Sequence, residues 1–130
     1  MEIPRGNSRE DIKARRQIIK DLFAEWISVH PDKKVWNKSL KSYIHIKYLS
    51  INETLGYAPL SYEATKAITE ITELLSYSKV KVIRPAKKND KNQRPFSDMV
   101  TLIYKEVHLM VGKQRTTNEF VMYSVTKKQR

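Results

Sequence analysis

The chain changes character at Ser78, and this change limits the folds open to it more than any other feature. Before Ser78, apolar residues recur at the spacing of about 3.6 residues that is typical of amphipathic helices. After Ser78, apolar and polar residues alternate with the period of two that is typical of strands. Helices followed by strands are typical of α+β folds. We therefore predict N-terminal helices packed on one face of a C-terminal four-stranded antiparallel sheet.

Two longer helices are expected before Ser78. Ser8 and Asp11 resemble a capping box, and helical spacing then continues to residues 30–31, His-Pro. Ser61 can cap a second helix over residues 61–76, which has one apolar face. Between these helices, residues 36–44 fit a short helix, but the segment YIHIKYL also alternates like a strand. The end of this middle element stays open between the two interpretations.

A short helical turn is also expected where Ser50 and Glu53 resemble a capping box, ending near Gly56. After Ser78, four segments have strand patterns: 79–83, 98–105, 107–111 and 119–126. The whole chain, 1–130, is therefore expected to form a single domain with a helical part (8–76) and a basic sheet part (79–126). Residues 84–95 contain five basic side chains and two prolines, and we predict a mobile basic loop there.

Positive charge is concentrated in the sheet part. Of the net charge of +11, residues 1–78 hold 12 basic and 10 acidic side chains, whereas residues 79–130 hold 13 and 4. Such a one-sided field attracts polyanions, so nucleic acid, an anionic membrane surface and an acidic protein are the candidate partners. A basic stripe on the first helix could join the same surface. The candidate nucleic-acid-binding residues are Arg9, Lys13, Arg16, Lys20, Arg84, Lys87, Lys88, Lys91, Arg94, Lys113 and Arg115.

Several classes of chemistry are excluded or unsupported by the sequence. The chain has no cysteine, no phosphate-binding glycine loop and no histidine spacing typical of a metal site, so we expect no metal and no cofactor. It has no apolar run long enough to cross a membrane and no signal peptide. We therefore expect a soluble, cytoplasmic protein without a membrane partner.

Metal-free cleavage of RNA is the remaining catalytic possibility, because the 2′-hydroxyl of RNA can attack its own phosphate. Such an enzyme needs a base, an acid and cations around the phosphate. Strand alternation places Phe120, Met122, Ser124 and Thr126 on one face of the last strand. That face is either a functional surface or simply the solvated side of the sheet.

The order of helix, IHIKYLSINET, helix, basic loop and four strands ending in VGKQRTTNEFVMYSVT resembles domains of Bacteroidetes phages and mobile elements. These domains are related to the barnase/EndoU/colicin/RelE-like nuclease superfamily, in which helices precede a four-stranded antiparallel sheet. The resemblance implies metal-independent RNA cleavage on the exposed sheet. The catalytic residues that it implies are His45, Arg115, and Ser124 or Thr126.

Three functions follow from these observations. The first is a noncatalytic RNA-binding protein of a phage or mobile element with a nuclease-like fold; RNA is preferred because no recognition-helix signature is present. The second is a small counter-defence (anti-CRISPR) inhibitor that binds a host nucleoprotein such as a CRISPR effector. The third is a metal-independent ribonuclease or toxin. The sequence favours the first over an enzyme and predicts no oligomeric state.

Overall fold

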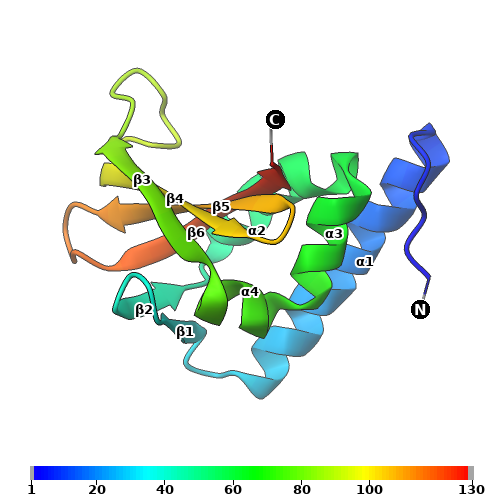
Figure 1. Ribbon diagram of the computed structural model, residues 1–130, viewed down its shortest axis with the longest axis horizontal. Coiled ribbons are helices and arrows are strands. Elements are labelled where there is room, and N and C mark those ends of the chain that lie inside the picture. Colours follow the sequence, from blue (N-terminus) through cyan, green and yellow to red (C-terminus); the bar gives the residue numbers. More distant parts are fainter. Residues whose placement is uncertain (1, 129–130) are drawn as a thin grey trace.

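The computed structural model describes residues 2–128, which form the helices and strands of Figure 1. The helical elements are α1 (Arg9–Val29), α2 (Tyr48–Tyr57), the short 3-10 helix η1 (Ala58–Leu60), α3 (Tyr62–Thr69) and α4 (Ile71–Tyr77). The strands are β1 (Lys34–Asn37), β2 (Ser42–His45), β3 (Lys79–Pro85), β4 (Phe96–Tyr104), β5 (Val107–Gln114) and β6 (Phe120–Lys127).

The described strands form one curled, mixed sheet in the order β1-β2-β6-β5-β4-β3. Strands β3 to β6 pair as consecutive antiparallel neighbours, whereas β2 and β6 are parallel, with Ile44 beside Phe120 and His45 beside Val121. The predicted α+β class is confirmed. The prediction of a four-stranded, purely antiparallel sheet is wrong, because β1 and β2 add a hairpin to the edge at β6.

The hairpin of β1 and β2 lies within the part of the chain that was expected to be helical. Its strands contain four residues each, too few to establish a period in the sequence. A buried polar anchor fixes it: the Asn37 side-chain amide donates to Leu75 O at 2.7 Å and Ser78 O at 3.0 Å, and its oxygen accepts from Leu40 N–H at 2.7 Å. These tertiary hydrogen bonds favour a strand and a turn over the alternative short helix.

Helix α1 confirms the first expected helix. The Ser8 hydroxyl accepts from Asp11 N–H at 3.1 Å and caps the helix. Ile19, Phe23 and Trp26 are buried on one face of α1 and pack in the main core, together with side chains of α3, α4 and the sheet. Helices α1, α3 and α4 lie together beside the sheet in Figure 1.

The second expected helix begins as predicted but is broken. Ser61 caps it by accepting from Ala64 N–H at 2.9 Å, yet Glu70 leaves the helical conformation (φ −109°, ψ 41°) and separates α3 from α4. The Glu70 carboxylate accepts hydrogen bonds from the Tyr104 hydroxyl and the Lys105 ammonium, both at 2.8 Å. These contacts connect the break to the turn between β4 and β5.

The two faces of the sheet carry separate apolar clusters. The main core takes Met122 and Val125 from β6, whereas Val121 and Tyr123 belong to a smaller cluster. A register shift in the pairing of β5 with β6 explains why Met122 and Val125 share a face although they are three residues apart. Ser124 therefore leaves the face of Met122, and the simple alternation expected for this strand is wrong.

A buried arginine ties the N-terminal segment to the fold. The Arg15 guanidinium is fully buried and donates to Pro59 O (2.7 Å), Pro4 O (2.9 Å) and Gly6 O (2.7 Å). Carbonyl oxygens therefore accept hydrogen bonds from Nε and Nη1 of Arg15, whereas Nη2 has no partner within the described residues. Arg15 connects the segment before α1 to η1.

Candidate nucleic-acid interface

The basic connection between β3 and β4 is a folded loop. Ala86 and Gln93 are buried, and the Gln93 side-chain oxygen accepts from Lys87 N–H at 3.0 Å. Within the loop, Gln93 N–H and Arg94 N–H both donate to Asp90 O, at 3.0 and 3.1 Å. Buried anchors and internal hydrogen bonds thus leave the basic side chains of the loop directed to the surface.

Arg115 joins this loop to the connection between β5 and β6. The Arg115 backbone N–H donates to Pro95 O at 2.9 Å, and its side-chain Nε donates to Arg94 O at 3.2 Å. Two segments that are about 20 residues apart in the sequence are therefore in contact, and Figure 1 shows both connections at the same end of the sheet.

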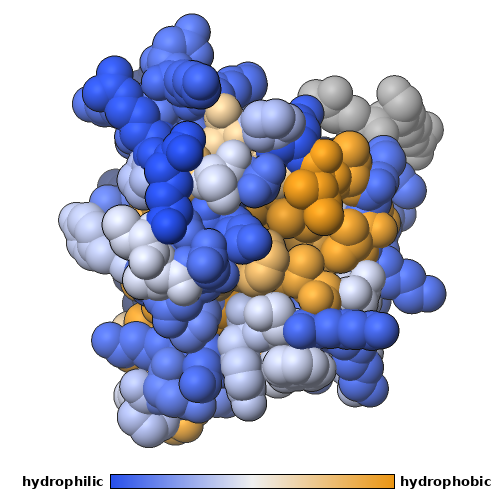
Figure 2. All heavy atoms as spheres, turned by 90° about the vertical axis from the view of Figure 1, so that its left-hand side faces the viewer, coloured by the Kyte–Doolittle hydropathy of each residue, from blue (hydrophilic) through white to orange (hydrophobic). Residues whose placement is uncertain are grey.

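This contact gathers seven of the eleven predicted nucleic-acid-binding residues into one surface, which we call the basic end surface. Its members are Arg84, Lys87, Lys88, Lys91, Arg94, Lys113 and Arg115. Segments 84–98 and 113–119 contain these seven basic and only three acidic side chains. Within residues 2–128, no carboxylate lies within 4.0 Å of any of the seven charges. Figure 2 shows this side of the molecule as mostly hydrophilic, with one large apolar area and smaller ones near its lower edge.

The other four predicted binding residues lie elsewhere. Arg9, Lys13, Arg16 and Lys20 are all on α1, which lies on the opposite side of the molecule from the two basic connections (Figure 1). The structure therefore does not join the basic stripe of α1 to the basic end surface.

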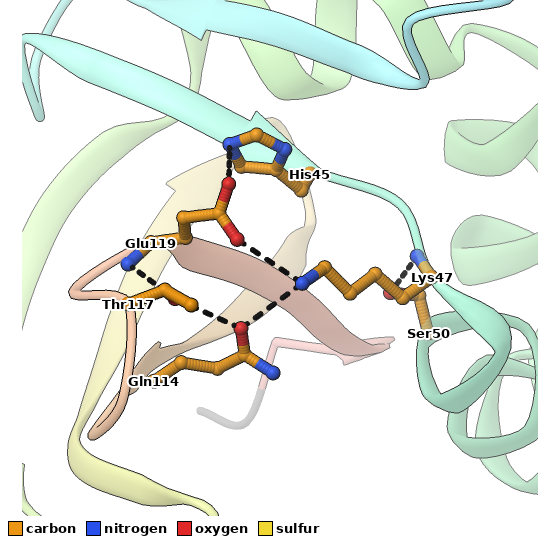
Figure 3. A network of polar contacts seen from close by, with 6 residues as sticks. All are labelled: His45, Lys47, Ser50, Gln114, Thr117 and Glu119. Carbon is orange, nitrogen blue, oxygen red and sulfur yellow. Dashed lines mark hydrogen bonds and ion pairs between the residues drawn. The ribbon is translucent and has the colours of Figure 1, made fainter.

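A polar network borders the basic end surface at the end of β2 (Figure 3). Glu119 Oε2 lies 3.4 Å from His45 Nε2, and Glu119 Oε1 lies 3.1 Å from Lys47 Nζ. Lys47 Nζ also donates to Gln114 Oε1 at 3.0 Å, and the same oxygen accepts from the Thr117 hydroxyl at 3.0 Å. The network thus connects the end of β2 to the connection between β5 and β6.

The network follows from the parallel pairing of β2 with β6. Because Ile44 lies beside Phe120 and His45 beside Val121, Glu119, just before β6, is within side-chain reach of His45, and the long side chain of Lys47, just after β2, extends back to the same carboxylate. Lys47 is also fixed at the start of α2, since its backbone N–H donates to the Ser50 hydroxyl at 3.0 Å. Glu119 is positioned by its own N–H, which donates to the Thr117 hydroxyl at 3.1 Å.

The charges of this network stabilise the ionised form of Glu119. The hydrogen bond from the Lys47 ammonium is the main cause that lowers the pKa of the Glu119 carboxyl, and the charges of His45 and Lys47 act in the same direction. Partial burial opposes them. Both carboxylate oxygens have a partner, so Glu119 is better suited to orient His45 and Lys47 than to accept a proton itself.

The four predicted catalytic residues are not gathered in one place. His45 and Arg115 lie at the end of the sheet that holds the network. Ser124 is buried, and Thr126 is further along β6. At about 3.3 Å per residue, Ser124 lies roughly 10 Å and Thr126 roughly 17 Å along the strand from Val121, the residue that pairs with His45. The structure thus places His45 and Arg115 at the same end of the sheet, on β2 and after β5, and separates both from Ser124 and Thr126.

Sequence reasoning did not select Glu119, Gln114 or Lys47 as site residues. Glu119 is the one acid in the segment VGKQRTTNEF, at the start of the last strand, and this was the available signal. Its partners could not be chosen without the parallel pairing of β2 with β6.

His108 does not join the network either. It lies on β5 opposite Thr126, and burial is the main cause that lowers the pKa of its imidazole, with the charges of Lys81 and Lys128 adding to it. Over residues 2–128, no group of three histidine or carboxylate side chains is arranged to hold a metal ion. Nor does the described part of the chain contain a helix with the length and apolar character of a membrane span.

Comparison with known proteins gives no match: no family model, no curated protein and no solved structure is significantly similar to this chain. The resemblance to the nuclease superfamily therefore stays a prediction.

Proposed function

We propose that the protein binds RNA through the basic end surface. The observation that supports this most is the contact of Arg115 with residues 94 and 95, which gathers at one end of the sheet seven cations that have no carboxylate partner among residues 2–128. A cluster of this kind attracts the phosphate backbone and releases its counterions on binding. A solvated surface with mixed charges would not need this segregation.

Single-stranded RNA fits this surface better than duplex DNA. The surface is built from two connections and the ends of three strands, without a helix that could enter a major groove. Proteins commonly recognise RNA at single-stranded segments, where the bases are accessible. The proposal is therefore binding of an RNA strand with phosphates along the basic end surface.

Salt dependence tests the proposal. If each of the seven cations contacts one phosphate of a single strand, the slope of log K against log salt is about −5, and affinity falls about 1,000-fold between 50 and 200 mM salt. The measurement is fluorescence anisotropy with a labelled 10-nucleotide oligouridylate. Affinity that hardly changes over this range would contradict binding by the basic end surface.

Metal-independent cleavage of RNA is a second candidate, favoured by the pair of His45 and Glu119. In such a reaction the 2′-oxygen attacks phosphorus, the bond to the 5′-oxygen breaks, and a 2′,3′-cyclic phosphate and a 5′-hydroxyl are formed. His45, oriented by Glu119, would take the 2′-proton, and the Lys47 ammonium could protonate the leaving oxygen or stabilise the phosphate charge.

Cleavage is tested by incubating pure protein with RNA in EDTA. The ribonuclease hypothesis expects cyclic-phosphate products that disappear in the His45→Ala variant and decrease in Glu119→Gln. Intact RNA after long incubation, together with salt-dependent binding, would exclude cleavage and leave the binding function.

A further inference from the structure

The outer face of the β1–β2 hairpin carries an exposed aromatic pair. Trp36 and Tyr43 are directly opposite each other in the antiparallel register, and their rings are 5.2 Å apart in an edge-to-face arrangement. Both remain exposed, at 48% and 44%. Their strand neighbours Val35 and Ile44 point to the main core, so the aromatic pair is on the solvent side of the hairpin.

Lysines surround this pair. The Lys34 ammonium lies 4.4 Å from the centre of the Tyr43 ring, and Lys38 lies 4.6 Å from the ring of Tyr77, which is also exposed. Residues 32–47 contain five lysines and one acid, Asp32. Cations held over aromatic rings on a basic surface are typical of proteins that stack nucleobases between phosphate contacts.

Two of the lysines have an unusual backbone conformation. Lys33 (φ 51°) and Lys41 (φ 55°) adopt the left-handed conformation, which is costly for a residue with a side chain. Glycine would adopt it without strain. Lys33 comes just before β1, and Lys41 comes just before β2. Backbone conformation alone would favour glycine at both positions, yet the chain has lysine.

The aromatic pair is continuous with the network at the end of β2. Tyr43 and His45 are two residues apart on one strand, so their side chains share a face and lie about 7 Å apart along it. Lys34 is opposite His45 in the register. From His45 the face continues through Glu119, Lys47 and Gln114 to the basic end surface.

We propose that the outer face of the β1–β2 hairpin, with Trp36 and Tyr43 as stacking rings, binds the unpaired bases of a single-stranded nucleic acid. This inference rests on the proposed function, since the phosphates of the same strand would lie on the basic end surface. It assigns the recognition of bases to a hairpin that is distinct from the phosphate-binding loops.

The test compares two labelled strands of ten nucleotides: oligouridylate, and the same strand with abasic riboses. Phosphate contacts are equal in the two strands, whereas stacking requires bases. The wild-type protein should bind oligouridylate at least about 5-fold more tightly than the abasic strand. The double variant Trp36→Ala/Tyr43→Ala should lose this difference and keep its affinity for the abasic strand.

Two control variants make the result specific. Trp36→Phe retains a stacking ring and should keep most of the preference for bases. Tyr62→Ala removes a ring that also lies under a cation, Arg5 at 4.0 Å, from α3 beside the turn between β4 and β5, at the opposite end of β5, and should change neither affinity. Circular dichroism confirms that each variant is folded before binding is measured.

The outcomes separate this inference from the proposed function. Equal, salt-dependent binding of both strands by the wild type would overturn base stacking and leave phosphate binding in place. Failure to bind either strand at 50 mM salt would overturn the proposed function and this inference with it. Competition by polyglutamate as strong as that by oligouridylate would assign the hairpin face to an acidic protein and overturn the inference.

Discussion

Glu119→Gln is the substitution that most sharply separates binding from catalysis. Glu119 is the acid at the centre of the network, where it neutralises Lys47 at 3.1 Å and contacts His45 at 3.4 Å. A phosphate placed about 7 Å from this carboxylate is repelled by about 0.6 kcal/mol in a water-like dielectric. Removing the charge also frees Lys47 to contact the strand. We expect the variant to bind oligouridylate about two- to fivefold more tightly.

Stability should change in the opposite direction. The ion pairs of Glu119 are half-exposed, and such pairs contribute about 0.5 kcal/mol each, so the variant should lose no more than about 1 kcal/mol. The network lowers the pKa of Glu119 from its ordinary value of 4.5. The contribution of Glu119 to the free energy of unfolding is therefore complete above pH 4.5 and is lost as pH falls through the lowered pKa. Urea denaturation should therefore show a difference from the wild type at pH 7 that becomes smaller at pH 3.

The control for Glu119→Gln is Glu106→Gln, which removes the same charge from the turn between β4 and β5, at the opposite end of β5. Anisotropy titrations of the two variants and the wild type at one salt concentration give the comparison. Weaker binding by Glu119→Gln, or an equal gain in both variants, would refute the position assigned to the strand. Loss of RNA cleavage in Glu119→Gln would instead support the ribonuclease.

Three further variants test separate parts of the structure. Lys41→Gly should raise the free energy of unfolding by up to about 1 kcal/mol, because it relieves the backbone strain of a left-handed lysine. The same variant should bind oligouridylate more weakly. Thermal denaturation measures the first effect, and anisotropy measures the second. Arg15→Ala should lower the free energy of unfolding in urea by about 3 kcal/mol or more, since three carbonyl oxygens lose their donor; a loss under 1 kcal/mol would contradict the anchor. Gly112→Ala places a Cβ 2.6 Å from Cγ of the buried Phe96 ring and should cost about 1–3 kcal/mol in the same assay, whereas an unchanged midpoint would show that the ring can move.

Local patterns predicted most of the fold. Helix α1 and its cap at Ser8 follow from hydrophobic spacing, and the four strands after Ser78 follow from alternation. The break at Glu70 has no local signal, because partners on β4 and in the next turn stabilise it. The β1–β2 hairpin was missed for a similar reason: Asn37 is held by carbonyls about 40 residues away.

The site was predictable only in part. Charge counting selected the members of the basic end surface, but the sequence could not show that Arg115 brings two connections together or that the stripe on α1 lies elsewhere. Glu119 and Lys47 meet through the parallel pairing of β2 with β6, a contact between distant segments that periodicity does not reveal. Trp36 and Tyr43 have the residue types of a core, and their exposure depends on the register of the hairpin.

The most direct test of RNA binding by the basic end surface compares two triple variants with the same loss of charge. One changes Lys87, Lys88 and Lys91 to glutamine in the β3–β4 loop, and the other changes Arg9, Lys13 and Lys20 to glutamine on α1. We expect the loop variant to bind oligouridylate with a salt slope that is less steep than the wild-type slope by about 2, and the helix variant to keep the wild-type slope. Equal changes in both variants would show a nonspecific response to net charge and would contradict the assigned surface.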